Sequence, residues 1–299
     1  MGLQPANVLT VIQQLRDVPA VFDRLRRLRL TDTPAHAVRV VYAGLADLGS
    51  RHVGSVDELK SYVLAAEESS LEDALRPIAA EFPGLESATI WNRRQWEGIV
   101  NTAHGCAADL IVKAAHADEQ PVFLRAPDDW NLLRHARVPV LMVAPGEWKN
   151  RPDIAAAIDV HDRAHAELNR RVLETADSVR GRVEGHLHIV SAVPSVGVLL
   201  DNAPLDQDSL RRELDAEARE LIDELCTTLG VTNYVPHVVA GEAGPRLGAL
   251  CEEQGMDLLV LGAKARSGLA GFMLGNTSQS MLAHASVDVL TVPIDAGPA

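Results

Sequence analysis

Short runs of hydrophobic residues alternate along the chain with longer segments whose hydrophobic positions follow helical spacing. Such alternation is typical of β-α-β units, in which helices cover a parallel sheet. In the second half of the chain it predicts five strands and four helices. The expected strands are Ile154–Ile158, His186–Ala192, Tyr234–Val239, Leu258–Leu261 and Val287–Val292, and the expected helices are Arg163–Val179, Ser209–Leu229, Pro245–Gln254 and Thr277–His284.

The same pattern occurs twice in the chain. The run ADLIVKAA at Ala108–Ala115 is answered by MDLLVLGA at Met256–Ala263, and LLRHARVPVLMV at Leu132–Val143 is answered by MLAHASVDVLTV at Met281–Val292. The copies are 148 residues apart in the first pair and 149 in the second, so their lengths differ by one residue over this stretch. We therefore predict an α/β fold of two tandem, doubly wound parallel sheets with five strands each, whose ligands bind beyond the carboxyl ends of the strands.

The 299 residues are enough for two domains of this kind. We predict a first domain over residues 1–146 and a second over residues 147–299. The joint between them falls in APGEWKNRPD at Ala144–Asp153, whose polar, proline- and glycine-bearing composition predicts an exposed linker.

Charge and composition narrow the range of partners. With 28 Lys and Arg against 41 Asp and Glu, the net charge of −13 repels a phosphate backbone, so neither nucleic acid nor an anionic membrane is an expected partner. The sequence shows no signal-peptide pattern and no apolar run of about 18 residues or more, so we expect a cytoplasmic protein. Cys106, Cys226 and Cys251 are widely spaced within apolar helical stretches and are expected to be buried, reduced thiols.

The segment GAKARSGLAGFMLGNTSQS, which begins at Gly262, carries the clearest candidate chemistry. Gly262 is expected to end the fourth strand of the second copy, and Gly275-Asn276-Thr277 to open a helix whose free N–H groups can hold a phosphate. Lys264 and Arg266 can add charge-assisted hydrogen bonds. The alternative is a glycine-rich loop capped by Asn276, with both cations in solvent.

This spacing resembles the G-x2-G-x9-G-[ST] loop of the universal stress proteins. Gly262 and Gly275 match its first and third glycines, Ala265 stands in place of the second, and Asn276 replaces Ser or Thr. The motifs L-G-N-T at Leu274–Thr277, D-W-x-L-L-R at Asp129–Arg134 and K-A-A-H at Lys113–His116 are similar to those of tandem members of this family.

The resemblance implies an adenine-nucleotide α-hydrolase-like fold, a role in stress-response signalling, and ATP, with Mg, as a cofactor of the second copy. The family's acidic residue at the end of the first strand, which lies against the adenosine in nucleotide-binding members, matches Asp159. The nucleotide-binding residues expected from this match and from the loop are Asp159, Gly262, Lys264, Ala265, Arg266, Gly275, Asn276 and Thr277.

The first copy departs from this pattern at every matching position. Gln13 replaces Asp159, Ala114 replaces Gly262, and Ala126-Pro127-Asp128 replaces Gly275-Asn276-Thr277. A proline at a helix start removes an N–H donor, and an aspartate there repels an anion. We expect this copy to be structural and to pair with the second as subunits of a twofold dimer do, a geometry that also permits a homodimer of chains.

Two further interpretations stay open. Val193–Leu205 is apolar where a loop should be polar, so it either covers the core or the interface between the copies, or walls an apolar cavity. The alternative to nucleotide binding is a non-nucleotide interaction scaffold or a binder of an apolar or lipid ligand. The sequence contains no G-x-S-x-G, H-E-x-x-H or G-x-x-x-x-G-K-[ST] motif, so catalysis is not expected. The pairs His161/His165 and His186/His188 lack a third ligand and are expected to be surface histidines rather than a metal site.

Overall fold

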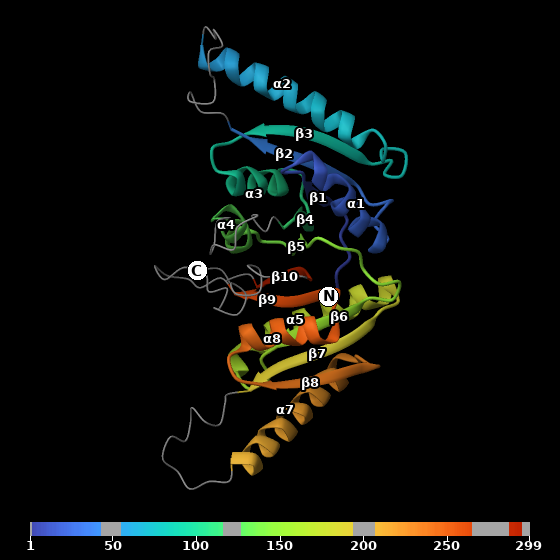
Figure 1. Ribbon diagram of the computed structural model, residues 1–299, viewed down its shortest axis with the longest axis vertical. Coiled ribbons are helices and arrows are strands. Elements are labelled where there is room, and N and C mark those ends of the chain that lie inside the picture. Colours follow the sequence, from blue (N-terminus) through green and yellow to red (C-terminus); the bar gives the residue numbers. More distant parts are fainter. Residues whose placement is uncertain (1, 43–54, 116–126, 194–206, 265–286, 295–299) are drawn as a thin grey trace. The chain divides into compact units, whose positions relative to one another are not determined.

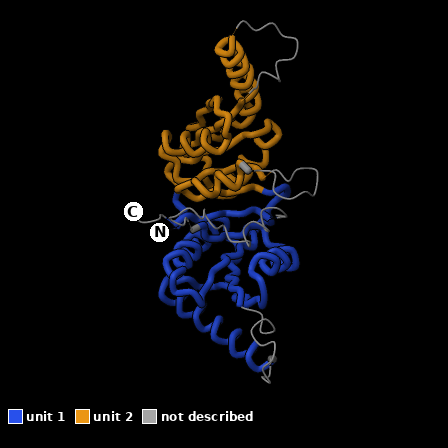
Figure 2. The backbone as a smooth tube through the Cα atoms, turned by 90° about the vertical axis from the view of Figure 1, so that its left-hand side faces the viewer, with its two compact units in different colours: residues 1–4, 117–123, 144–299 blue, residues 5–116, 124–143 orange. Residues whose placement is uncertain are grey.

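The computed structural model describes residues 2–42, 55–115, 127–193, 207–264 and 287–294. Two compact units divide the chain, as Figure 2 shows by colour. The N-terminal unit comprises residues 5–116 and 124–143, and the C-terminal unit comprises residues 1–4, 117–123 and 144–299. The first four residues therefore belong to the C-terminal unit, although the chain then enters the other one.

Both units have the same parallel five-stranded topology. The order is β3-β2-β1-β4-β5 in the N-terminal unit and β10-β9-β6-β7-β8 in the C-terminal unit. The N-terminal strands are β1 (Val8–Val11), β2 (Ala35–Val41), β3 (Leu85–Trp91), β4 (Leu110–Ala114) and β5 (Val140–Val143), and the C-terminal strands are β6 (Asp153–Ile158), β7 (His186–Val193), β8 (Tyr234–Ala240), β9 (Leu258–Lys264) and β10 (Asp288–Ile294).

Helices connect the strands of each unit, as can be followed in Figure 1. They are α1 (Val18–Arg27), α2 (Val56–Leu75), α3 (Gln95–Gly105) and α4 (Pro127–His135) in the N-terminal unit, and α5 (Ala166–Val183), α7 (Gln207–Leu229) and α8 (Ala243–Gln254) in the C-terminal unit. The α/β fold of tandem doubly wound parallel sheets predicted from the sequence is confirmed. Among the described helices, none is both long and apolar enough to cross a membrane.

The strands are buried as a parallel sheet covered on both faces requires. Every residue of β1 and β5 is buried, whereas β3 and β8, each at one end of its unit's order, are mostly half-buried. Cys226 in α7 and Cys251 in α8 are buried as expected, and burial raises the pKa of these thiols to about 11 and about 12. Cys106, which follows α3, is only half-buried.

An aspartate of the internal repeat binds the same part of the backbone in each unit. Asp109, before β4, accepts the N–H of Ala6 (2.8 Å) and of Asn7 (3.2 Å) through Oδ2. Asp257, before β9, accepts the N–H of Lys149 (2.9 Å) and of Asp153 (2.8 Å). The repeated Asp-Leu dipeptide therefore fixes the chain where it enters the first strand of each sheet.

The expected exposed linker is partly wrong. Residues 145–147 and 149–151 are exposed, but Trp148 is only 4% exposed because its indole packs into the C-terminal unit and donates a hydrogen bond to Asp288. A second difference concerns the expected helix Arg163–Val179. It divides into a 3-10 turn, Arg163–His165, and α5, which continues to Val183.

Candidate functional site

In the C-terminal unit, the strand order reverses between β6 and β9. β6 pairs with β7 on one side and with β9 on the other, and the register joins Ala157 to Leu261. From β6 the chain adds β7 and β8 in one direction and then β9 and β10 in the other. In open parallel sheets, the crevice beyond the carboxyl ends of two such strands is the place where ligands bind.

Asp159 lies at this point, directly after β6. Its Oδ1 accepts the N–H groups of His161 (3.2 Å) and Asp162 (3.3 Å), and its Oδ2 lies 3.0 Å from Nδ1 of His165. The side chain is 49% exposed. Asp159 therefore orders the turn that leads into α5, while about half of its side chain stays exposed to solvent.

The side chain of Asn169, in α5, fixes the backbone of Asp159 through two hydrogen bonds. Its Oδ1 accepts the Asp159 N–H (3.1 Å) and its Nδ2 donates to the Asp159 carbonyl (2.6 Å). Asn169 is only 5% exposed, so its amide has little water to bond with. The sequence prediction missed this residue, although a buried asparagine among the apolar positions of a helix is an available signal.

Gly262 lies inside β9, whereas the sequence predicted that it would end the strand. β9 runs two residues further, and Gly262 pairs with Val292 of β10. A Cβ atom at Gly262 would lie 2.4 Å from Cδ1 of Leu168, a residue of α5. This glycine is therefore needed for the close packing of α5 on the sheet, whatever the site binds.

The remaining predicted residues are described only in part. Lys264 is the last residue of β9. Ala265, Arg266, Gly275, Asn276 and Thr277 lie outside the described residues, as do the expected helix Thr277–His284 and residues 194–205 of the apolar segment. Of the predicted site, the structure places Asp159 directly after β6 and Gly262 inside the neighbouring strand β9.

One group of possible metal ligands occurs within the described part of the chain. Ligand atoms of Asp159, Asp162 and His165 lie within 4.8 Å of one another. Oδ1 of Asp162 caps the 3-10 turn by accepting the N–H of Ala164 (2.8 Å), and His165 Nδ1 lies 3.6 Å from Asp162 Oδ2. Hydrogen bonds within the turn account for this arrangement, so we assign no metal centre here.

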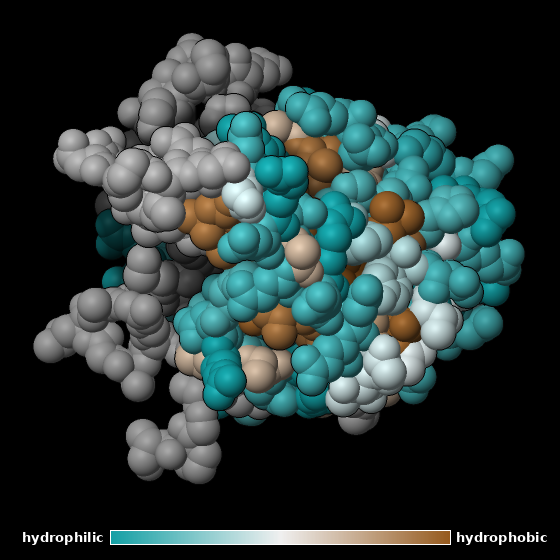
Figure 3. Space-filling view, turned by 90° about the horizontal axis from the view of Figure 1, so that it is seen from below, coloured by the Kyte–Doolittle hydropathy of each residue, from teal (hydrophilic) through white to brown (hydrophobic). Residues whose placement is uncertain are grey.

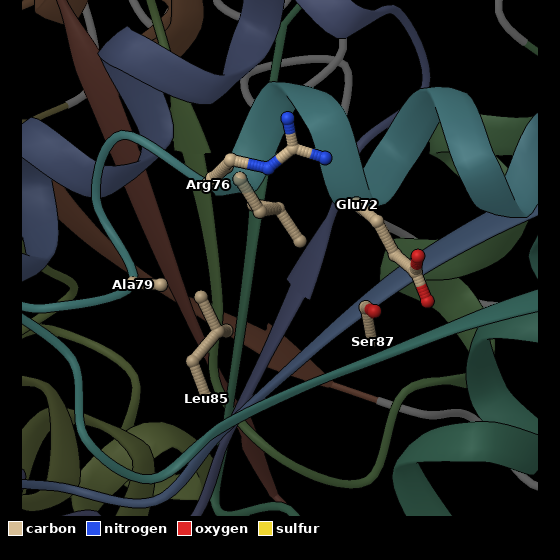
Figure 4. A pocket seen from close by; sticks show the side chains of 6 residues that line it. Glu72, Arg76, Ala79, Leu85 and Ser87 are labelled. Carbon is tan, nitrogen blue, oxygen red and sulfur yellow. The ribbon is translucent and has the colours of Figure 1, made fainter.

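A pocket of about 250 Å³ lies elsewhere, in the N-terminal unit between the end of α2 and the start of β3 (Figure 4). Glu72 of α2, Arg76 directly after this helix, and Leu85 and Ser87 of β3 line it. Ligand pockets usually hold about 300 to 1,000 Å³. The pocket is therefore small for an organic ligand, and none of the predicted site residues lines it.

Comparison with known proteins identifies the fold and the family. A sequence model of the universal stress protein family matches residues 153–293. Universal stress protein E of Photorhabdus laumondii is 25% identical over 218 residues, which cover 71% of this chain and 69% of the relative. Universal stress protein A homolog 1 of Coxiella burnetii is 30% identical over 139 residues, which cover 46% of this chain and 94% of the relative.

Similarity of the fold extends over nearly the whole chain. A crystal structure of a functionally unknown protein from Pseudomonas aeruginosa, 23% identical, superposes with a TM-score of 0.71 and covers 97% of this chain and 93% of its own. A universal stress protein from Archaeoglobus fulgidus, 15% identical, gives a TM-score of 0.65 over 97% of this chain. Together with the match to the Coxiella relative over almost its full length, these findings show that the chain belongs to the universal stress protein family.

Proposed function

We propose that the C-terminal unit binds a phosphate-bearing ligand, with Mg-ATP as the first candidate, beyond the carboxyl ends of β6 and β9. The observation that carries this proposal is the position of Asp159. It follows β6 directly at the reversal of strand order, with about half of its side chain open to solvent. An exposed carboxylate that is already held in place can accept hydrogen bonds from the hydroxyl groups of a ribose.

The phosphate part of the proposal rests on sequence. Lys264 ends β9, and the sequence continues through Ala265 and Arg266 to Gly275-Asn276-Thr277. Two cations and a glycine before an expected helix start suit an anion. We propose that these residues receive the phosphates while Asp159 receives the nucleoside.

We also propose that the N-terminal unit is structural. Lys113 in β4 is 2% exposed, and its Nζ lies 2.8 Å from Oδ1 of Asp129 in the first turn of α4. At the neighbouring strand end, Gln13 donates to Oε1 of Gln95 (2.9 Å). The polar side chains described near this unit's own reversal of strand order are therefore bound in two pairs, and the ammonium of Lys113 is already neutralised by a carboxylate.

Isothermal titration of the full chain with Mg-ATP tests both proposals. We expect one site per chain. Asp159→Asn keeps an acceptor for the turn but removes the charge and should weaken binding, whereas Gln13→Ala, at the matching position of the first copy, should leave it unchanged. Gly275→Val should abolish binding because it places a side chain where the phosphate approaches the backbone.

Each proposal would be refuted by a particular result. Equal affinity in wild type, Asp159→Asn and Gly275→Val would refute the C-terminal site. A phosphate seen crystallographically at Pro127–Asp129 after soaking would refute the structural role of the first copy.

The described residues do not form a broad apolar docking face of the kind that a scaffold would use. The large hydrophobic side chains that are exposed in the described residues are scattered over several elements: Leu15, Tyr42, Val56, Tyr62 and Val235. On the face shown in Figure 3, hydrophilic residues predominate, and hydrophobic ones occur in separate small patches. Scattered exposed hydrophobic residues are normal for a protein surface and need no partner.

A further inference from the structure

Two histidines on neighbouring strands of the C-terminal unit share a hydrogen bond. Nδ1 of His188 in β7 lies 2.9 Å from Nε2 of His237 in β8. The ring centroids are 5.2 Å apart and the ring planes differ by 24°. The rings therefore meet nitrogen to nitrogen and nearly parallel to each other.

An acidic group on the next strand fixes the orientation of this pair. Nε2 of His188 lies 3.3 Å from Oδ1 of Asp153 in β6, and Oδ2 of Asp153 lies 2.6 Å from Nζ of Lys149. Burial alone would favour the neutral carboxyl, but the hydrogen bonds from Lys149 and His188 outweigh it and hold the pKa of Asp153 below its ordinary value. A carboxylate only accepts hydrogen bonds, so Nε2 of His188 carries a hydrogen.

The number of protons on the pair follows from this geometry. When both rings are neutral, Nδ1 of His188 is bare and accepts the Nε2–H of His237. One added proton can be held by either ring, and in both cases a single hydrogen still lies between Nδ1 of His188 and Nε2 of His237. A second added proton leaves two N–H groups facing each other at 2.9 Å without an acceptor, and places two positive charges in contact. The hydrogen bond thus holds with zero or one added proton and fails with two.

The surrounding groups strengthen this limit. Burial lowers the pKa of His237, and the positive charges of His188 and of Arg219 in α7 lower it further. His186, two residues before His188 on the same face of β7, is exposed. Asp257 lies 3.7 Å from Nζ of Lys149, at the far end of this series of ionic groups.

Three helices pack on these two strands: α5 on β7, and α7 and α8 on both. In α7, Arg219 is paired with Asp215 (2.8 Å). The residues of α8 that are buried are Gly244, Leu247 and the thiol-bearing Cys251. Its charged residues Arg246, Glu252 and Glu253 are exposed. This helix therefore brings no buried carboxylate that could neutralise a second proton.

The sign of the pH effect is fixed by the unfolded state. A histidine in an unfolded chain has a pKa of about 6.5, and a lower value in the folded state means that the unfolded chain binds more protons in between. The stability contributed by the neutral ring of His237 is therefore complete above about pH 6.5 and is lost as the pH falls below that value.

We propose that the pair His188–His237 is an acid-sensitive latch, which fastens β8 to the sheet at neutral pH and releases it when the second proton binds. Among the described strands of its unit, β8 is the last in the order and pairs with β7 alone. When the hydrogen bonds between these two strands open, no other strand of the unit takes the place of β7. Release therefore exposes backbone groups of β8 to water and to exchange.

Hydrogen exchange of the full chain at pH 7.5 and pH 5.0 tests the latch. The exchange rates are corrected for the intrinsic effect of pH, and both buffers contain EDTA so that no metal ion binds to the histidines. We expect protection of residues 234–240 to fall at pH 5.0, by at most about thirtyfold, because pH 5.0 lies about 1.5 units below the ordinary pKa of a histidine and each unit corresponds to a factor of ten. His237→Gln should remove most of this fall. His186→Gln, which changes an exposed histidine of β7, should retain all of it.

A fall of equal size in wild type and His237→Gln would overturn the proposal, as would protection of β8 that does not change with pH in wild type. If His237→Gln fails to fold, imidazole ¹⁵N shifts of the wild type decide. A coupled titration in two separate steps, with loss of β8 protection at the second, supports the latch. Two independent titrations without an effect on β8 would refute it.

Discussion

The indole of Trp148 donates a hydrogen bond to Oδ2 of Asp288 (3.0 Å), and Oδ1 of the same carboxylate accepts the N–H of Ala144 (2.8 Å). Asp288 is 1% exposed and begins β10. This one side chain therefore ties the segment before β6 to the last strand of the C-terminal unit.

We predict that Asp288→Ala lowers the free energy of unfolding of the C-terminal unit by about 2 to 4 kcal/mol, because two buried donors lose their acceptor. Urea denaturation of the full chain, followed by circular dichroism, measures the change. Glu253→Ala, at an exposed position of α8, should stay within about 0.5 kcal/mol of wild type. Equal stability of the two variants would contradict the prediction.

The repeat and its hydrophobic pattern predict the strands well because a buried parallel strand is a property of consecutive residues. All five strands expected in the second half are present, and β6, β7 and β8 differ from their predicted bounds by a single residue at one end. β9 runs three residues past its predicted end. A glycine after an apolar run favours a strand end, but in a sheet covered by a closely packed helix it also makes room, as Gly262 does for Leu168.

The local details of the site are harder to predict, since they depend on packing between elements. The family pattern identifies Asp159, and helical spacing places Asn169 among the buried positions of α5, but this spacing does not show that the Asn169 amide bonds to the backbone of Asp159. In the same way, the sequence predicts a surface histidine at His188. It does not reveal the hydrogen bond to His237, because that residue lies 49 positions away in the chain. The pairing of the two copies and the nucleotide site stay predictions.

We predict that Asn169→Ala weakens Mg-ATP binding by about tenfold, because Asp159 loses the two hydrogen bonds that fix its backbone. Ser178→Ala is the matched control. It removes a hydrogen bond of the same helix, from Ser178 Oγ to the carbonyl of Leu3 (3.1 Å), away from Asp159. Both variants should lose stability, but only Asn169→Ala should lose affinity in isothermal titration. Equal affinities in the two variants would show that Asn169 has no positioning role.

The buried ion pair Lys113–Asp129 should be sensitive to the loss of one partner. Asp129→Asn leaves an ammonium that is 2% exposed without its carboxylate, which should lower the stability of the N-terminal unit by about 3 to 5 kcal/mol. Lys113→Met combined with Asp129→Leu should recover most of this loss, because neither charge then stays buried. Asp215→Asn, in the exposed pair with Arg219, should cost less than about 1 kcal/mol. Chemical denaturation that finds an equal loss of unfolding free energy in Asp129→Asn and Asp215→Asn would disprove the prediction.

Gly262 offers a test that separates packing from ligand binding. We predict that Gly262→Ala destabilises the C-terminal unit by about 1 to 3 kcal/mol even without ligand, because the new Cβ would lie 2.4 Å from Cδ1 of Leu168 and one of the two must move. Leu168→Ala in the same chain should relieve the overlap, so the double variant should be more stable than the sum of the single changes indicates. Gly248→Ala in α8 is the control, since a Cβ there meets no atom within 4 Å, and alanine in a helix should raise stability slightly. Thermal denaturation of the wild type, the two single variants and the double variant gives the coupling free energy between positions 262 and 168. If Gly262→Ala leaves stability unchanged yet abolishes Mg-ATP binding, the glycine serves the ligand and not the helix, and the packing explanation is wrong.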